Sequence, residues 1–151
     1  MSTIDLGEPL YEYNLKITGL TEYGVSLQDL ASGKIPQPPE GARFDVAFAG
    51  EATGSKLSGK VSGVDYLHIR ADGRFQLDVH AEITTADGQK ISLKADGVAL
   101  PRQDSSISGL REKVTLFSSS KDYTWVNTIQ VWGVGSVDLA TQDIYIAGYS
   151  V

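Results

Sequence analysis

The stretch from Asp65 to Leu93 most constrains the fold, because its two short turns predict their own hairpin register. Apolar and polar residues alternate on both sides of the Ala-Asp-Gly sequences at 71–73 and 86–88. Side chains alternate between the two faces of a strand, and directly opposed residues of a hairpin share a face. A two-residue Asp-Gly turn would mix the faces, whereas a three-residue loop with a left-handed glycine keeps apolar residues together. The sequence therefore predicts a three-stranded antiparallel meander with one apolar face.

The three-residue loops also predict which residues lie opposite each other. The expected pairs are Ile69 with Phe75, Leu67 with Leu77, Ile83 with Ile91, Ala81 with Leu93, and Val79 with Ala95. The other face of the meander is polar and includes Arg70, Arg74, Asp78 and His80.

Asp65 shares the parity of Leu67 and Ile69, so this register places its carboxylate on the apolar face, opposite Val79. A carboxylate in such surroundings needs hydrogen-bond partners or a raised pKa. Acids of this kind are over-represented at functional sites. Two structural alternatives remain: Asp65 begins its strand in solvent, or it caps a bulge at residues 63–64.

Composition narrows the class of protein. The 151 residues suggest one domain, and 41% hydrophobic with 21% charged residues is an ordinary globular balance. A formal net charge of -6 argues against nucleic-acid or anionic-membrane partners. No apolar run is long enough to span a bilayer, and the N-terminus lacks the pattern of a signal peptide. The absence of cysteine excludes disulfides and thiolate ligands, and we expect a cytoplasmic protein.

The N-terminal third predicts an arm, a strand and a long excursion. Residues 1–10 are expected to form the arm, and the alternation at 11–17 predicts the first strand. Residues 18–42 break the alternation, with one helical turn capped by Ser26 and stopped by Gly33. We expect this segment to act as a lid or binding loop, or alternatively to wrap over a sheet edge.

The rest of the chain consists of short strands separated by turns. Residues 42–50 form a strand with Phe44 and Phe48 on one face, and the glycine-spaced residues 50–63 predict a curved strand or hairpin. A polar loop at 100–111, strands at 112–119 and 121–135, a turn near 138–142 and a last strand from Asp143 follow. About eight to ten strands with little helix predict an all-β domain. We favour a single closed antiparallel barrel over a sandwich, because the glycine spacing indicates strong curvature.

Asp65 and Asn127 form the sharpest candidate site. On the expected strand Asn127 shares a face with Trp125, so both polar groups would point into a closed barrel. An apolar, aromatic cavity with a few converging polar groups is the usual small-molecule site. Asp65 would move a proton while Asn127 stabilises oxyanion charge. The alternative is that both are buried structural groups. The expected substrate-binding wall consists of Tyr123, Trp125, Tyr13, Phe44 and Phe48.

The polar face supplies a second candidate, which we rank lower because outer faces of antiparallel sheets are usually solvated. Asp78 and His80 could form an acid–base pair, and Arg70 could bind a carboxylate. His68 and His80 would lie on the order of 13 Å apart, too far to share a metal ion. Since the sequence also lacks a nucleophile elbow and a phosphate loop, we expect no metal and no cofactor.

Four motifs together resemble a known family. They read GEATGSKLSGKVSGVDY at 50–66, RADG at 70–73, LDVHAEITTADG at 77–88 and YTWVN at 123–127. This combination is similar to domain-of-unknown-function family 3237, also called uncharacterised protein family 0311, over roughly residues 11–151. The positions that match its motifs are Asp65, Arg70, Asp78, Trp125 and Asn127. Tyr66 stands where tryptophan is usual and His80 where arginine is common, so contacts with a ligand would differ there.

The resemblance implies a calycin-like, lipocalin-like β-barrel that self-associates as a homodimer or higher oligomer, and it implies little about activity. We therefore expect a cofactor-independent lyase or isomerase acting on an aromatic or other apolar metabolite inside the barrel. The alternatives are a non-catalytic carrier of such a molecule and a structural homodimer.

Overall fold

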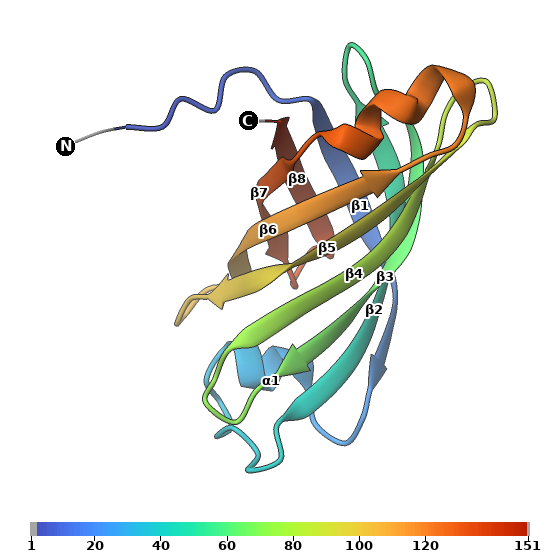
Figure 1. Cartoon of the computed structure of the whole chain (residues 1–151). Helices are drawn as coiled ribbons and strands as arrows, with labels where there is room; N and C mark the ends of the chain where they lie inside the picture. The colour runs from blue at the N-terminus through green and yellow to red at the C-terminus, as the bar shows by residue number, and fades with distance from the viewer. Residues whose placement is uncertain (1–2, 151) are drawn as a thin grey trace.

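The computed structural model describes residues 3–150, and these form a closed antiparallel barrel of eight strands (Figure 1). Each strand pairs with its neighbours in sequence, and β8 closes the barrel on β1. The strands are β1 (Tyr11–Glu22), β2 (Ala42–Thr53), β3 (Gly59–Ile69), β4 (Phe75–Thr84), β5 (Lys90–Pro101), β6 (Ile107–Phe117), β7 (Val131–Asp138) and β8 (Asp143–Ser150). Two short helices complete the fold: α1 (Leu27–Ala31) and the 3-10 helix η1 (Lys121–Thr128). The predicted fold class is confirmed.

The predicted register of the central meander is also confirmed. Arg70 N–H donates to the Arg74 carbonyl oxygen, so the first loop holds only residues 71–73. Gly73 in the first loop and Gly88 in the second have φ values of 91° and 82°, the left-handed conformation that such loops need. The ladders pair Ile69 with Phe75, Asp65 with Val79, Ile83 with Ile91, Ala81 with Leu93 and Val79 with Ala95. The expected pair of Leu67 with Leu77 falls in a break of the β3–β4 ladder.

The excursion between β1 and β2 covers one end of the barrel. The Ser26 hydroxyl accepts a hydrogen bond of 3.2 Å from Asp29 N–H, which caps α1 as the sequence predicted. Leu27 and Leu30 are buried beneath the loop, and the helix lies at the end of the barrel opposite η1 (Figure 1). Because the eight described strands form a closed barrel, the excursion covers an end of the barrel and no free sheet edge.

Several predicted boundaries are wrong. β1 continues to Glu22, so the excursion expected at 18–42 is shorter than predicted. The expected strand at 121–135 is η1 followed by β7. Its residues repeat every three positions and not every two, so that Tyr123, Val126 and Ile129 pack against the core. The expected loop at 100–111 is mostly strand, because β5 runs to Pro101 and β6 begins at Ile107. Within the part of the chain that the structure describes, no helix is long and apolar enough to cross a membrane.

Candidate functional site

The interior of the barrel contains a cavity of about 100 Å³, counted as space that the centre of a water molecule can reach. One water molecule needs roughly 10–15 Å³ on this measure, so the space exceeds a structural water site. All eight strands and α1 contribute to its wall, which is almost entirely aliphatic and aromatic. The polar exceptions are the carboxyl groups of Asp65 and Glu112, the hydroxyls of Tyr11 and Tyr13, and Ser108.

Asp65 lies on β3 and faces this cavity, as its parity predicted. The β3–β4 pairing is interrupted between Asp65–Val79 and His68–Gln76, and there Asp65 Oδ1 accepts a 3.0 Å hydrogen bond from Asp78 N–H. The carboxylate thus replaces a backbone acceptor of the ladder. Burial raises the pKa of Asp65 to about 6, although the Asp78 N–H opposes this rise. Asp65 is therefore neither in solvent nor the cap of a bulge at 63–64.

Glu112, on β6, brings a second carboxyl group into the same cavity. Its side chain is 8% exposed, and it forms no hydrogen bond or ion pair with any other residue between 3 and 150. Burial raises the pKa of Glu112 to about 7, and the negative charge of Asp65 adds to the effect. Near neutral pH a large fraction of Glu112 side chains is therefore protonated.

The sequence contained the signal for Glu112, although the prediction missed it. Glu112 has the parity of Leu110 and Val114, as Asp65 has that of Leu67 and Ile69. The expected loop at 100–111 ended one residue before Glu112. Glu112 was therefore placed at the first position of a strand, where a side chain is usually exposed to solvent. Only the full length of β6 places the carboxyl group in the middle of the wall.

Tyr11 and Tyr13 stack at the same cavity, with ring centroids 4.2 Å apart. Both hydroxyl oxygens are buried, and neither has a hydrogen-bond partner among the described residues. Burial raises the pKa of both phenols, which keeps them protonated as donors. Gly148 makes room for the Tyr11 ring, because a Cβ there would lie 2.3 Å from Tyr11 Cζ. The two hydroxyls lie close enough to influence each other, since Tyr13 opposes the rise in the pKa of Tyr11, and a ligand oxygen would compete with that contact.

The other predicted wall residues divide into two groups. Phe48 lines the cavity together with Tyr13, whereas Phe44 is fully buried in the core outside the cavity wall. Tyr123 and Trp125 lie on η1 and pack against the core without lining the cavity.

The predicted convergence of Asn127 with Asp65 is wrong. Asn127 is exposed on η1 and does not line the cavity. Its Oδ1 accepts from Ser118 N–H and its Nδ2 donates to the Ser118 carbonyl oxygen, both at 2.8 Å. The amide therefore ties η1 to the end of β6 and satisfies backbone groups.

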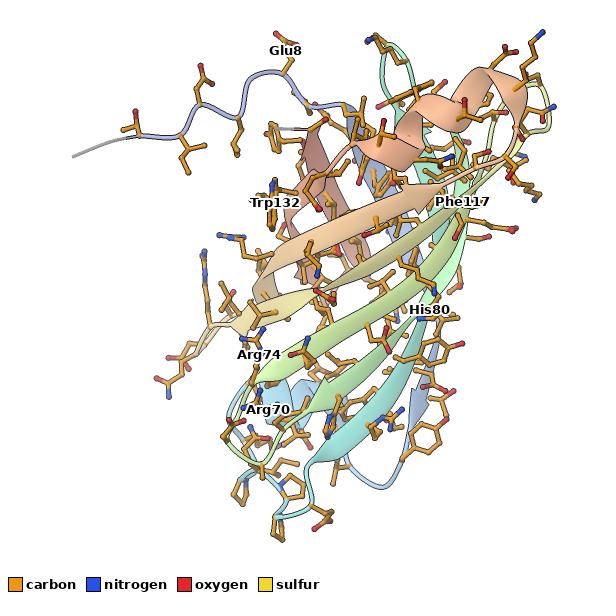
Figure 2. All side chains as sticks on the ribbon, in the orientation of Figure 1. Glu8, Arg70, Arg74, His80, Phe117 and Trp132 are labelled. Carbon is orange, nitrogen blue, oxygen red and sulfur yellow. The ribbon has the colours of Figure 1, made fainter. Side chains whose placement is uncertain are left out.

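The second-choice residues lie on the outer surface, where Figure 2 labels Arg70, Arg74 and His80. Asp78 and His80 approach to 3.3 Å with both side chains more than half exposed. Arg70 pairs with Asp72 in the first meander loop. Within residues 3–150 no three His, Asp or Glu side chains are placed to hold a metal ion. These side chains of the outer face are therefore exposed to solvent, as the sequence predicted.

Comparison with known proteins identifies relatives of the fold. A family model described as "Protein of unknown function (DUF3237)" matches residues 25–151. A β-barrel-like protein from Acinetobacter baumannii AYE is 19% identical, with a TM-score of 0.74 over 95% of this chain and 93% of that one. A protein of unknown function from Clostridium acetobutylicum is also 19% identical, with a TM-score of 0.76 over 95% and 97%.

A more distant neighbour, described as an enzyme from Penicillium herquei, has a TM-score of 0.57 and 19% identity over 98% of this chain and 99% of that one. The comparison with curated proteins found no match. At these identities the solved structures show a common barrel fold.

Proposed function

The chain belongs to the DUF3237 family of proteins of unknown function, and we propose that it is a cofactor-independent acid–base enzyme, a lyase or isomerase. One observation carries this proposal: two carboxyl groups, the half-buried Asp65 and the buried Glu112, face a single apolar cavity. Burying two acids without a cation costs free energy that an apolar pair would not. Strongly perturbed acids that share a cavity are the groups that acid–base catalysis uses.

The two environments suggest different roles for the two carboxyl groups. Asp65 accepts a backbone hydrogen bond and has the lower pKa, about 6, so it is the better candidate for the base. Glu112 lacks such a donor and has a pKa of about 7, so it is the better candidate for the acid. At neutral pH Asp65 is mostly ionised and Glu112 is about half protonated, so the base and the acid that proton transfer needs are both present at one cavity.

A complete reaction cycle follows from these roles. Asp65 removes a proton from a carbon next to a carbonyl group, and the electron pair moves onto the carbonyl oxygen. Tyr11 and Tyr13 donate hydrogen bonds to that developing oxyanion. As the electron pair returns from the oxygen, Glu112 gives a proton to a second carbon, which yields an isomer, or to a leaving group, which yields an elimination product. A proton then passes from Asp65 to Glu112 through solvent, and this restores the starting state of the enzyme.

The cavity wall favours an uncharged substrate. Its aliphatic and aromatic lining suits a small aromatic or alicyclic molecule with one or two oxygen atoms. The two carboxyl groups disfavour anions, and the cavity wall contains no lysine or arginine. That a barrel of similar shape from Penicillium herquei is described as an enzyme supports catalysis in this fold and says nothing about the reaction.

A carrier is the second candidate, and the coverage of both barrel ends favours it. The α1 segment covers one end and η1 the other, an arrangement that suits retention of a bound molecule (Figure 1). In a carrier the carboxyl groups would only position the ligand by hydrogen bonds.

Hydrogen exchange distinguishes the enzyme from the carrier. The protein is incubated in D2O with acetophenone, 1-indanone and 3,4-dihydrocoumarin, and proton NMR follows exchange beside the carbonyl group. We expect acceleration by the wild type and loss of roughly 10²–10⁴-fold in Asp65→Asn and in Glu112→Gln. Glu82→Gln is the matched control, because it removes an exposed carboxylate of β4 that pairs with Lys90 and does not line the cavity.

The same panel reports binding through saturation-transfer NMR. If these molecules bind without accelerated exchange in the wild type, the carrier is favoured over the enzyme. If both substitutions leave exchange unchanged, the assigned roles of Asp65 and Glu112 are wrong.

A further inference from the structure

The outer surface of β7 and β8 carries a group of apolar side chains. Trp132 and Tyr145 are exposed at 43% and 41%, and Figure 2 labels Trp132 on the outside of the barrel. We call this surface the β7–β8 face; it consists of the exposed Trp132 and Tyr145, the half-buried Val134 and Tyr149, and Ala147, which is only 4% exposed. Large exposed aromatic side chains grouped on one surface are typical of an interaction site.

Two opposite charges flank this face at the same position along the strands, which we call the same height. The register places Arg111 of β6 beside Val134, Val134 beside Ala147, and Ala147 beside Glu12 of β1. Arg111 and Glu12 therefore stand on either side of a small apolar pair. In the described chain neither forms an ion pair, and Arg111 donates only to the Leu110 carbonyl oxygen.

We propose that the β7–β8 face binds a second copy of this chain, related by a two-fold axis along the seam between β7 and β8. Rotation about this axis exchanges β7 with β8 and β6 with β1 while it preserves height. Arg111 of one copy then meets Glu12 of the other, and the pair occurs twice, as an isologous interface requires. The same rotation brings Trp132 of one copy against Tyr149 of the other, because these residues are paired in the ladder.

The arrangement favours a second copy over an unrelated partner. Opposite charges placed symmetrically about a seam complement their own rotated image, and an unrelated surface would have no need of that symmetry. Val134 and Ala147 are small, so two convex barrels can approach closely along the seam. Aromatic side chains above and below this point would supply the apolar area that a stable dimer buries.

Charge reversal tests the interface in the full-length chain by sedimentation equilibrium at 150 mM NaCl. We expect the wild type to have twice the 16.2 kDa mass of one chain. Arg111→Glu alone and Glu12→Arg alone should each weaken association at least tenfold, because each places like charges opposite one another. The double variant restores opposite charges, and we expect its association to recover to near the wild-type value.

A matched control and a second variant complete the test. Lys60→Glu makes the same change in charge on β3, away from this face, and should leave the mass unchanged. Trp132→Ser should weaken association without any change in charge. A monomeric wild type up to 200 μM overturns the proposal, as does a dimer that both single reversals leave intact or that the double variant fails to restore.

Discussion

At the residue scale, the most informative position is Glu112. A buried carboxyl group lowers the stability of the fold, so a functional role would explain its presence there. An acid that is 8% exposed and has no partner in the described part of the chain destabilises the fold whenever it ionises. A glutamine of the same shape would fill the space without that cost. The residue therefore gives a pH-dependent contribution to stability that can be measured without knowing the substrate.

The sign of this dependence follows from linkage. The pKa of Glu112 is about 7 in the folded protein against an ordinary value of 4.5, so its favourable contribution is complete below pH 4.5 and lost as pH rises through 7. That shift corresponds to on the order of 3 kcal/mol. We expect the free energy of unfolding of Glu112→Gln, relative to wild type, to rise by about that amount between pH 4.5 and pH 8 in urea titrations.

Glu82→Gln is the control for this prediction, because Glu82 is exposed on β4 and only pairs with Lys90 at 3.2 Å. Its difference from wild type should change little over the same pH range. A difference for Glu112→Gln that is independent of pH would show that this carboxyl group is not buried.

At the scale of elements, η1 shows how a local pattern can mislead. The residues from Tyr123 onward alternate well enough to predict a strand, yet they form a 3-10 helix over the end of the barrel. Two hydrogen bonds between the Asn127 side chain and the Ser118 backbone, one accepted and one donated by the amide, stabilise the compact turn. Asn127 therefore has a structural role: its amide fixes the backbone of Ser118, nine residues earlier in the chain.

Replacing Asn127 by alanine separates the structural role from the catalytic one. The substitution leaves the Ser118 backbone N–H and carbonyl without partners, so we expect a loss of about 1–3 kcal/mol in the free energy of unfolding. Deuterium exchange catalysed at saturating ketone should stay within about twofold of wild type. Thr128→Ala, the next residue of η1, is the control and should be nearly neutral in both assays. A loss of turnover in stable Asn127→Ala would return Asn127 to the site.

At the scale of the whole molecule, closure of the barrel creates the site. Tyr11 comes from β1, Asp65 from β3 and Glu112 from β6, and these strands are not adjacent in the barrel. Only the closed wall turns their side chains toward one interior space, where burial among apolar residues raises the pKa values of both acids. The charge of the cavity therefore depends on the complete barrel, because the two acids come from strands that are not adjacent.

This property predicts which ligands stabilise the protein. At pH 8 both carboxyl groups are largely ionised, so the wild type should bind acetophenone and reject benzoate, which is similar in size but anionic. A ligand at ten times its dissociation constant stabilises the fold by roughly 1.4 kcal/mol, a measurable rise in Tm. We expect benzoate to raise Tm only in the Asp65→Asn, Glu112→Gln double variant. Equal stabilisation of the wild type by both ligands would contradict an acidic cavity.

By itself, the sequence determined the meander register, the two Ala-Asp-Gly loops, the capped turn at Ser26 and the inward direction of Asp65. Each of these depends on period-two alternation or on turn chemistry, which act over a few residues. Only the tertiary structure decided that Glu112 and Tyr11 join Asp65 while Asn127 and Trp125 do not. That choice depends on where β6 begins, on whether residues 121–128 extend or coil, and on which strands face each other across a closed barrel. Contacts between distant segments settle all three, because the alternation within any one strand is the same whichever strand lies opposite.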